Sequence, residues 1–421
     1  MANGTAALGA NPKLVAGAGL AIVIIATTFA AVLGNPVVVL VTTYIVAFGA
    51  AIILFGDDAF SRATNLIIAI YAAVIAFVCT LSPLPNAAIQ GLPLTDRLNY
   101  YYIYYVGTSL AGIQENIESG FLFLVNVAQP IMPFEIFLAV ISVGVLLSFL
   151  GFLRATGQER LIGIVALLFL AYFSFWSGAL NITRQFVAAG VCMSAVCLLV
   201  GPGSMTTRTR VLLYLALVAV ASSMHSSAII FVLFALAYAV RRFGGALLVG
   251  AWIGNIVLFA LNFVNASPLL LIPGLSDRLA RYDSSQLSDA SLAQFQSSGV
   301  TTGNRIDWAI VLLSPMLLYS IALISRRRRG LTAGSDDIFV IALLYTVLCV
   351  PFYLLSFLTF GDRIAFYAFL VLPVFLMATV TASLGREVRY AALVSVAAIC
   401  VLQVAIGLYG YTPKLWLTGE L

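Results

Sequence analysis

Several arginines in this sequence lie outside its hydrophobic segments and could together bind a large anion. Arg278 and Arg281 are three residues apart, so a helical turn would place them on one face. A guanidinium group directs two N–H donors at phosphate oxygens and stays charged at any working pH. Two or three such groups could hold a diphosphate, or they could bind lipid headgroups or pair with nearby aspartates. Further candidates for the same role are Arg305 and Arg363.

Two other polar sites occur where hydrophobic segments meet. Arg184 and Gln185 open a hydrophobic segment, where Arg184 could contact a substrate or extend to the membrane surface. His225 is the only histidine and lies in a short turn between two such segments. It could be a general base, a neutral hydrogen-bond donor to phosphate, or a turn residue with a structural role alone.

Carboxylates and tyrosines near these positions could complete a site. Glu118 lies at the start of the short apolar stretch 117–128 and is our first candidate for a general base. The tyrosines at positions 100–105 could stack on sugar rings or form the aromatic belt of a membrane interface. The candidate sugar-binding residues are Asp96, Tyr101, Gln185, Tyr282 and Asp362.

The sequence lacks the motifs of metal- and nucleotide-dependent chemistry. It contains no nucleotide-binding loop, no HExxH and no Cys/His cluster, and its five cysteines all fall in hydrophobic segments. The net charge of +5 comes from arginines that flank those segments, so it does not indicate nucleic-acid binding. We therefore expect no metal, no cofactor and no nucleic-acid partner.

The elements that must position these residues are transmembrane helices. The chain is 62% hydrophobic and 9% charged, with a mean hydropathy of +1.09. A helix needs about 20 apolar residues to cross roughly 30 Å of hydrocarbon, and its backbone groups must be satisfied internally. We expect an all-α, polytopic membrane protein with about 13 transmembrane helices in a single integral membrane domain, 1–421. The predicted spans are 14–33, 36–55, 64–81, 134–153, 161–180, 182–200, 209–224, 226–240, 246–264, 306–325, 338–359, 364–382 and 389–410.

The distribution of basic residues orients these spans. With a cytoplasmic N-terminus, 14 of the 21 Lys and Arg fall in inner loops, as the positive-inside rule requires, and the C-terminus lies outside. Two long outer loops result: 82–133, with a short interfacial or re-entrant helix, and 265–305. The seven basic residues on the outer side are Arg97, Arg184, Arg278, Arg281, Arg305, Arg363 and Lys414.

The outer residues resemble a family pattern in both order and placement. The sequence resembles the EpsG-like group of Wzy-type polysaccharide polymerases from about residue 96 to residue 370. The segments that carry the resemblance are Asp96-x-x-Asn99-Tyr100, Glu118-x-Gly120-Phe121, Arg184-Gln185, His225-x-Ser227-Ala228 and Asp362-Arg363-Ile364 with Tyr367.

This resemblance implies a glycosyltransferase of the bacterial inner membrane with a GT-C-like fold. Such an enzyme joins undecaprenyl-diphosphate-linked oligosaccharide repeats at the periplasmic face, in O-antigen, exopolysaccharide or capsule synthesis. It implies a lipid-linked oligosaccharide substrate, and a flippase and a chain-length regulator of the same pathway as possible partners. Arg278, Arg281, Arg305 and Arg363 would clamp the diphosphate. Arg184, His225 and Glu118 would act at the reacting atoms.

Two other functions fit the same residues. A secondary transporter or flippase of a lipid-linked or anionic sugar would carry ionisable residues in mid-span, whereas the charges here stand at span ends. An O-antigen ligase relative would differ from a polymerase only in its acceptor.

Overall fold

The computed structural model describes residues 62–81, 96–106, 117–170, 172–180, 182–263, 309, 312–320, 336–355 and 365–383. These ranges contain helices and no strand, which confirms the all-α expectation for the described part of the chain. Three predicted spans (14–33, 36–55 and 389–410) and the second long loop (265–305) lie outside the described residues.

Apolar helices make up most of the described chain. Four of them are long and apolar enough to cross a membrane: α6 (Phe134–Ala155), α9 (Thr183–Val200), α10 (Thr207–Met224) and the part Ile338–Leu355 of α16 (Asp336–Leu355). Shorter apolar helices lie within α3 (Arg62–Thr80), α12 (Gly245–Phe263) and α18 (Phe366–Ser383), and in the joined η4 (Ser226–Ile230) and α11 (Phe231–Ala239). Two single-turn helices, η3 (Glu159–Leu161) and η5 (Arg241–Phe243), also lie between them.

The span predicted at 161–180 is not one straight helix. It consists of α7 (Ile162–Leu170) and α8 (Phe173–Leu180), and the two parts are bent by 66°. At the bend the indole Nε1 of Trp176 donates to the carbonyl of Leu170 across 2.7 Å. A side-chain donor thus satisfies a carbonyl at the end of α7, where the regular helical hydrogen bonds stop. The chain then turns towards α9 through a bond from Ile182 N to Ser177 O (2.9 Å).

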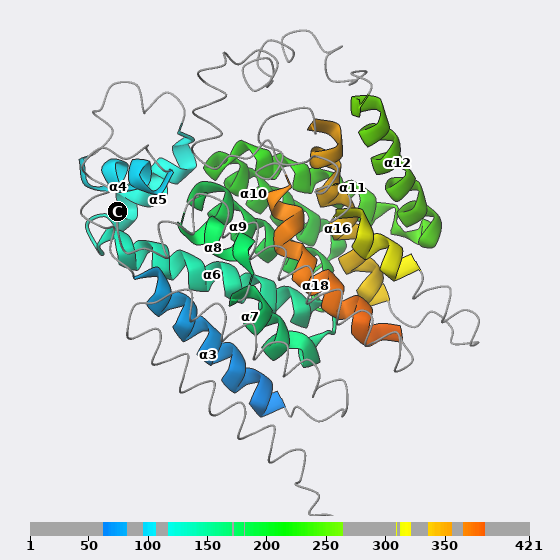
Figure 1. Ribbon diagram of the computed structural model, residues 1–421, viewed down its shortest axis with the longest axis horizontal. Coiled ribbons are helices and arrows are strands. Elements are labelled where there is room, and N and C mark those ends of the chain that lie inside the picture. The colour runs from blue at the N-terminus through cyan, green and yellow to red at the C-terminus, as the bar shows by residue number, and fades with distance from the viewer. Residues whose placement is uncertain are drawn as a thin grey trace, which may run out of the picture.

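The helices pack around α9 and α16 (Figure 1). α9 contacts both α6 and α10, and α3 packs on α6 and α7. α16 contacts α11, α12 and α18, and its Tyr345 ring stacks on Phe375 of α18 at 4.8 Å. The apolar stretch of α16 is 72% buried, whereas that of α10 is only 17% buried, so α16 is central and α10 peripheral.

A close contact joins the starts of α9 and α18 to α8. A Cβ atom at Gly178 of α8 would lie 2.4 Å from Phe186 of α9 and 2.7 Å from Phe366 of α18. A larger residue at position 178 would therefore push apart the two helices whose first turns carry Arg184 and Tyr367.

A second, smaller core lies at one end of α6. It joins the tyrosine-rich α4 (Asp96–Val106) and the short α5 (Ser119–Ala128) to the first residues of α6. Tyr104 is fully buried there and donates its hydroxyl to Met132 O at 2.5 Å. Burial, with a smaller contribution from Tyr105, raises the pKa of the Tyr104 phenol, so it stays a neutral donor. The long loop expected at 82–133 therefore contains two packed helices.

Candidate functional site

Glu118 is held at the N-terminal end of α5. Its backbone is extended (φ −64°, ψ 137°), and its carbonyl accepts from Phe121 N (3.1 Å) and Leu122 N (3.2 Å), so α5 begins directly after it. Its side chain does not cap α5 but reaches across to two other elements. Oε2 forms an ion pair with Arg184, and Oε1 accepts from the backbone N–H of Ser226 at 3.3 Å.

A glycine brings Glu118 close enough for these contacts. A Cβ atom at Gly120 would lie 2.2 Å from Ser223 Oγ and 2.7 Å from the Ser223 backbone, at the C-terminal end of α10. The absence of a side chain at Gly120 lets α5 pack directly on α10, next to the turn that carries Ser226.

Arg184 lies in the first turn of α9 and contacts two partners from the smaller core. Its Nη1 pairs with Glu118, its Nε donates to Tyr100 Oη at 3.2 Å, and its guanidinium lies 5.8 Å from the centroid of the Tyr100 ring. The Arg184 and Glu118 side chains are 22% and 23% exposed, so the pair is partly shielded from water. Partial burial strengthens such an interaction relative to a surface ion pair.

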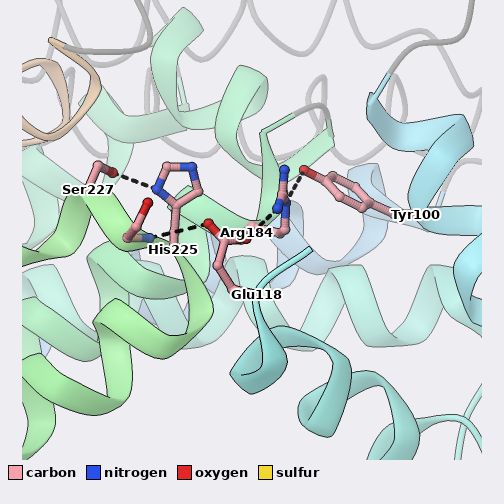
Figure 2. Close-up of polar contacts among 6 residues, drawn as sticks. Tyr100, Glu118, Arg184, His225 and Ser227 are labelled. Atoms are coloured by element: carbon pink, nitrogen blue, oxygen red, sulfur yellow. Dashed lines mark hydrogen bonds and ion pairs between the residues drawn. The ribbon is translucent and has the colours of Figure 1, made fainter. Parts of the chain in front are cut away.

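His225 ends α10 and continues the polar site towards α18. Its backbone N–H donates to Ala221 O (2.9 Å), and the chain then becomes extended (φ −157°), which turns it into η4. Its Nδ1 lies 2.6 Å from Ser227 Oγ, which in turn lies 3.1 Å from Tyr367 Oη in the first turn of α18. Figure 2 shows the His225 ring between Ser227 and the Glu118–Arg184 pair.

These contacts join six elements, α4, α5, α9, α10, η4 and α18, at one end of the helices. α9 and α18 begin there, α10 ends there, and α4 and α5 pack against them. The result is two hydrogen-bonded groups, Tyr100–Arg184–Glu118 and His225–Ser227–Tyr367, which the bond from the backbone N–H of Ser226 to Glu118 brings side by side. We call the two groups together the polar cluster; its members are Tyr100, Glu118, Arg184, His225, Ser227 and Tyr367.

The structure brings together the three residues predicted to act at the reacting atoms, Glu118, Arg184 and His225. Gln185 follows Arg184 and is 4% exposed. The Tyr101 ring packs on Tyr105 and Phe134, whereas Tyr100, one residue earlier, contacts Arg184.

The other predicted positions lie wholly or partly outside the described residues. Asp96 lies in the first turn of α4, and its side chain is outside the described part of the structure. Six further predicted residues lie outside the described residues: Arg278, Arg281, Tyr282, Arg305, Asp362 and Arg363.

Three members of the polar cluster were not singled out from the sequence, although Tyr100 lies among the tyrosines that could stack on sugar rings. Tyr100, Ser227 and Tyr367 all belong to the segments that carry the family resemblance, which was the available signal. The backbone N–H of Ser226 is a fourth participant, and no residue type could have revealed it.

The polar cluster can bind an anion and accept a proton. Arg184 supplies fixed positive charge, Glu118 supplies a carboxylate, and His225 supplies a ring whose second nitrogen is not part of the bond to Ser227. Among the described residues, no group of three or more His, Cys, Asp or Glu side chains has an arrangement that could hold a metal ion.

A comparison with protein families gives one match, which covers most of the chain. The model described as the EpsG family matches residues 76–417, a range that contains all six members of the polar cluster. No curated protein and no solved structure matches the chain.

Proposed function

This membrane protein belongs to the EpsG family, and we propose a specific reaction for it. Membership of that family supports a general role as a polysaccharide polymerase. It joins oligosaccharide repeat units carried on undecaprenyl diphosphate at the periplasmic face of the bacterial inner membrane. The growing glycan is transferred from its lipid diphosphate onto the next lipid-linked repeat, which extends an O-antigen, exopolysaccharide or capsule chain. The fold in this proposal is GT-C-like, with about 13 spans.

The observation that carries the proposal is the polar cluster itself. Four segments of the chain that share the family pattern, around Tyr100, Glu118, Arg184 and His225, meet through direct contacts. The ion pair of Glu118 and Arg184 joins residues 66 positions apart, so the fold has assembled it from distant parts of the sequence. A guanidinium beside a carboxylate is the minimum that this transfer needs.

The proposed chemistry uses the two charges for different tasks. An acceptor hydroxyl oxygen bonds to the anomeric carbon of the donor sugar while the bond from that carbon to the diphosphate oxygen breaks. The electron pair leaves with the lipid diphosphate, and the hydroxyl proton passes to Glu118. Arg184 stabilises the charge that develops on the diphosphate, in a site partly shielded from water. This step requires no metal.

Residues of the two long outer segments, together with positions 185, 362 and 363, complete the site in this proposal. Arg278, Arg281, Arg305 and Arg363 clamp the phosphates, and Asp96, Tyr101, Gln185, Tyr282 and Asp362 contact the sugars. The excess of Lys and Arg in the predicted inner loops supports the orientation, with the N-terminus cytoplasmic and the C-terminus periplasmic. The flippase and the chain-length regulator of the same pathway are the proposed partners.

Product analysis with purified protein tests this function. The protein in detergent or nanodiscs is incubated with an undecaprenyl-diphosphate-linked repeat, and the lipid-linked glycans are separated by length. We expect products of two or more repeats, which transport cannot produce. Transfer to a lipid A core acceptor, without lengthening of the lipid-linked glycan, would instead identify a ligase.

Two substitutions connect the activity to the proposed residues. Arg184→Ala and Arg278→Ala should abolish the longer products while the amount of protein in the membrane stays unchanged. Arg154→Ala is the matched control, because Arg154 is 78% exposed and makes only a long ion pair (3.7 Å) with Glu159. Normal chain lengths in both variants would refute the assignment.

A further inference from the structure

The hydrogen bonds from Tyr367 through Ser227 to His225 have a definite direction. Tyr367 is 2% exposed, and Ser227 Oγ, at 3.1 Å, is the hydrogen-bond partner of its hydroxyl among the described residues. A phenol has one hydrogen to donate, and a buried donor without an acceptor is unfavourable. The Tyr367 hydroxyl therefore donates to Ser227 Oγ.

The direction of the first bond fixes that of the second. Ser227 Oγ has one hydrogen of its own, and His225 Nδ1 lies 2.6 Å away. Since Ser227 already accepts from Tyr367, its hydrogen is directed to Nδ1, which must then be the unprotonated nitrogen. A neutral imidazole carries one N–H, so the hydrogen of His225 is on Nε2.

The opposite tautomer, with the hydrogen on Nδ1, leaves the hydroxyl hydrogen of Ser227 without its acceptor. If Nδ1 carried the hydrogen, Ser227 Oγ would accept from both His225 and Tyr367, and its own hydrogen would lose Nδ1 as its acceptor. The free-energy cost of an unpaired polar hydrogen in a partly buried site changes the ratio of the two His225 tautomers by about tenfold. Tyr367 thus favours one tautomer of a ring that it does not itself contact.

We propose that Tyr367 and Ser227 are positioning residues that hold His225 in its Nε2–H tautomer, so that His225 donates a hydrogen bond to an anionic oxygen of the substrate. The identity of that oxygen rests on the proposed function, in which it belongs to the diphosphate leaving group. A ring nitrogen that already carries a hydrogen cannot accept the proton of the sugar hydroxyl. Of the two base candidates, His225 and Glu118, the carboxylate is therefore the base.

The single histidine of the chain permits a direct measurement of the tautomer. Protein labelled with ¹⁵N-histidine, and purified with a tag that lacks histidine, gives side-chain signals from His225 alone. At a pH where the ring is neutral, NMR distinguishes the protonated from the unprotonated nitrogen by its shift and its one-bond coupling. We expect the hydrogen on Nε2 in the unmodified protein.

Substitutions then test the cause. In Tyr367→Phe, Ser227 becomes free to accept from the ring, so an Nδ1–H population should appear. Ser227→Ala removes the same restraint by a second route and should shift the ratio in the same direction. Tyr345→Phe is the control, because it removes a buried hydroxyl that donates to Leu312 O (2.9 Å) away from this site. It should leave the tautomer unchanged.

Activity separates a donor from a base. His225→Gln retains an N–H donor and should keep measurable polymerisation, whereas His225→Ala should lose it. A hydrogen on Nδ1 in the unmodified protein, or a tautomer ratio unaffected by both Tyr367→Phe and Ser227→Ala, would overturn the positioning role. Equal activity of His225→Gln and His225→Ala would overturn the donor role. Failure to polymerise by the unmodified protein would count against the proposed function and would leave the tautomer result standing.

Discussion

Arg184 and Glu118 form an ion pair between the first turn of α9 and the residue that precedes α5. The two side chains are similarly shielded, at 22% and 23% exposure, and each has a further partner. Tyr100 Oη accepts from Arg184 Nε, and the backbone N–H of Ser226 donates to Glu118. Each side chain therefore keeps one partner when the other member of the pair is replaced. Arg184 and Glu118 can thus be tested by separate substitutions.

Glu118→Gln should lower polymerisation by at least about a hundredfold, because it removes the proposed proton acceptor while it keeps the shape of the side chain. Its effect on stability should be modest, about 1–2 kcal/mol, since the pair is partly shielded but the Gln amide oxygen can still accept from Arg184. Product length and membrane abundance are the two measurements. Glu159→Gln removes the carboxylate of the exposed pair with Arg154 and serves as the control. Full activity of Glu118→Gln would contradict its role as the base.

Tyr100→Phe should reduce polymerisation by about tenfold or more, because a hydrogen bond to a charged group contributes about 1.5–3 kcal/mol. The ring remains and continues to face the guanidinium of Arg184. Tyr101→Phe is the natural comparison, since Tyr101 is adjacent in sequence and packs on Tyr105 and Phe134 instead. Initial rates with the lipid-linked repeat distinguish the two variants. A larger loss in Tyr101→Phe would restore Tyr101 as the more important tyrosine.

Gly120→Ala should displace α5 from α10 and separate Glu118 from Arg184. The added methyl group would overlap the side chain and the backbone of Ser223, and overpacking of this kind costs about 1–3 kcal/mol. Ser223→Ala should not rescue it, because the backbone overlap remains. Gly144→Ala in α6 is the control, since a Cβ atom there has no neighbour within 4 Å. Unchanged activity of Gly120→Ala would show that the close approach is dispensable.

Trp176→Phe should destabilise the bend between α7 and α8 by about 2–3 kcal/mol, from the lost hydrogen bond to Leu170 O and the volume removed from a buried site. Trp252→Phe provides a matched comparison, because the buried Nε1 of Trp252 has no hydrogen-bond partner among the described residues. The thermal midpoint in detergent should fall more for Trp176→Phe than for Trp252→Phe. Equal shifts would mean that volume alone determines the effect.

The hydrophobic segments were the most predictable feature of the sequence. The spans expected at 134–153, 182–200 and 209–224 correspond to α6, α9 and α10, with ends that differ by at most two residues. Length and apolarity suffice there because the membrane imposes both. They could not predict the bend within 161–180, because hydropathy does not show that the indole N–H of Trp176 donates back to Leu170 O.

The site was predictable in its residue types but not in its contacts. Arg184, Glu118 and His225 were selected because polar residues at the ends of hydrophobic segments are costly without a partner. The choice among the tyrosines at 100–105 depended on the rotation of α4, which five similar residues within six positions do not reveal. Ser226 contributes through its backbone, so its side chain gave no signal.

Glu118, the proposed base, and Arg184 lie next to separately packed regions. Tyr100 and the residues that follow Glu118 are part of the small core of α4 and α5, whereas the residues next to Arg184 and His225 belong to the large one. Substitutions among the tyrosines and phenylalanines of the small core can therefore change the position of Glu118 relative to Arg184 and His225. The packing of the main bundle would stay intact. The packing of α4 and α5 on the bundle therefore determines where Tyr100 and Glu118 lie relative to Arg184.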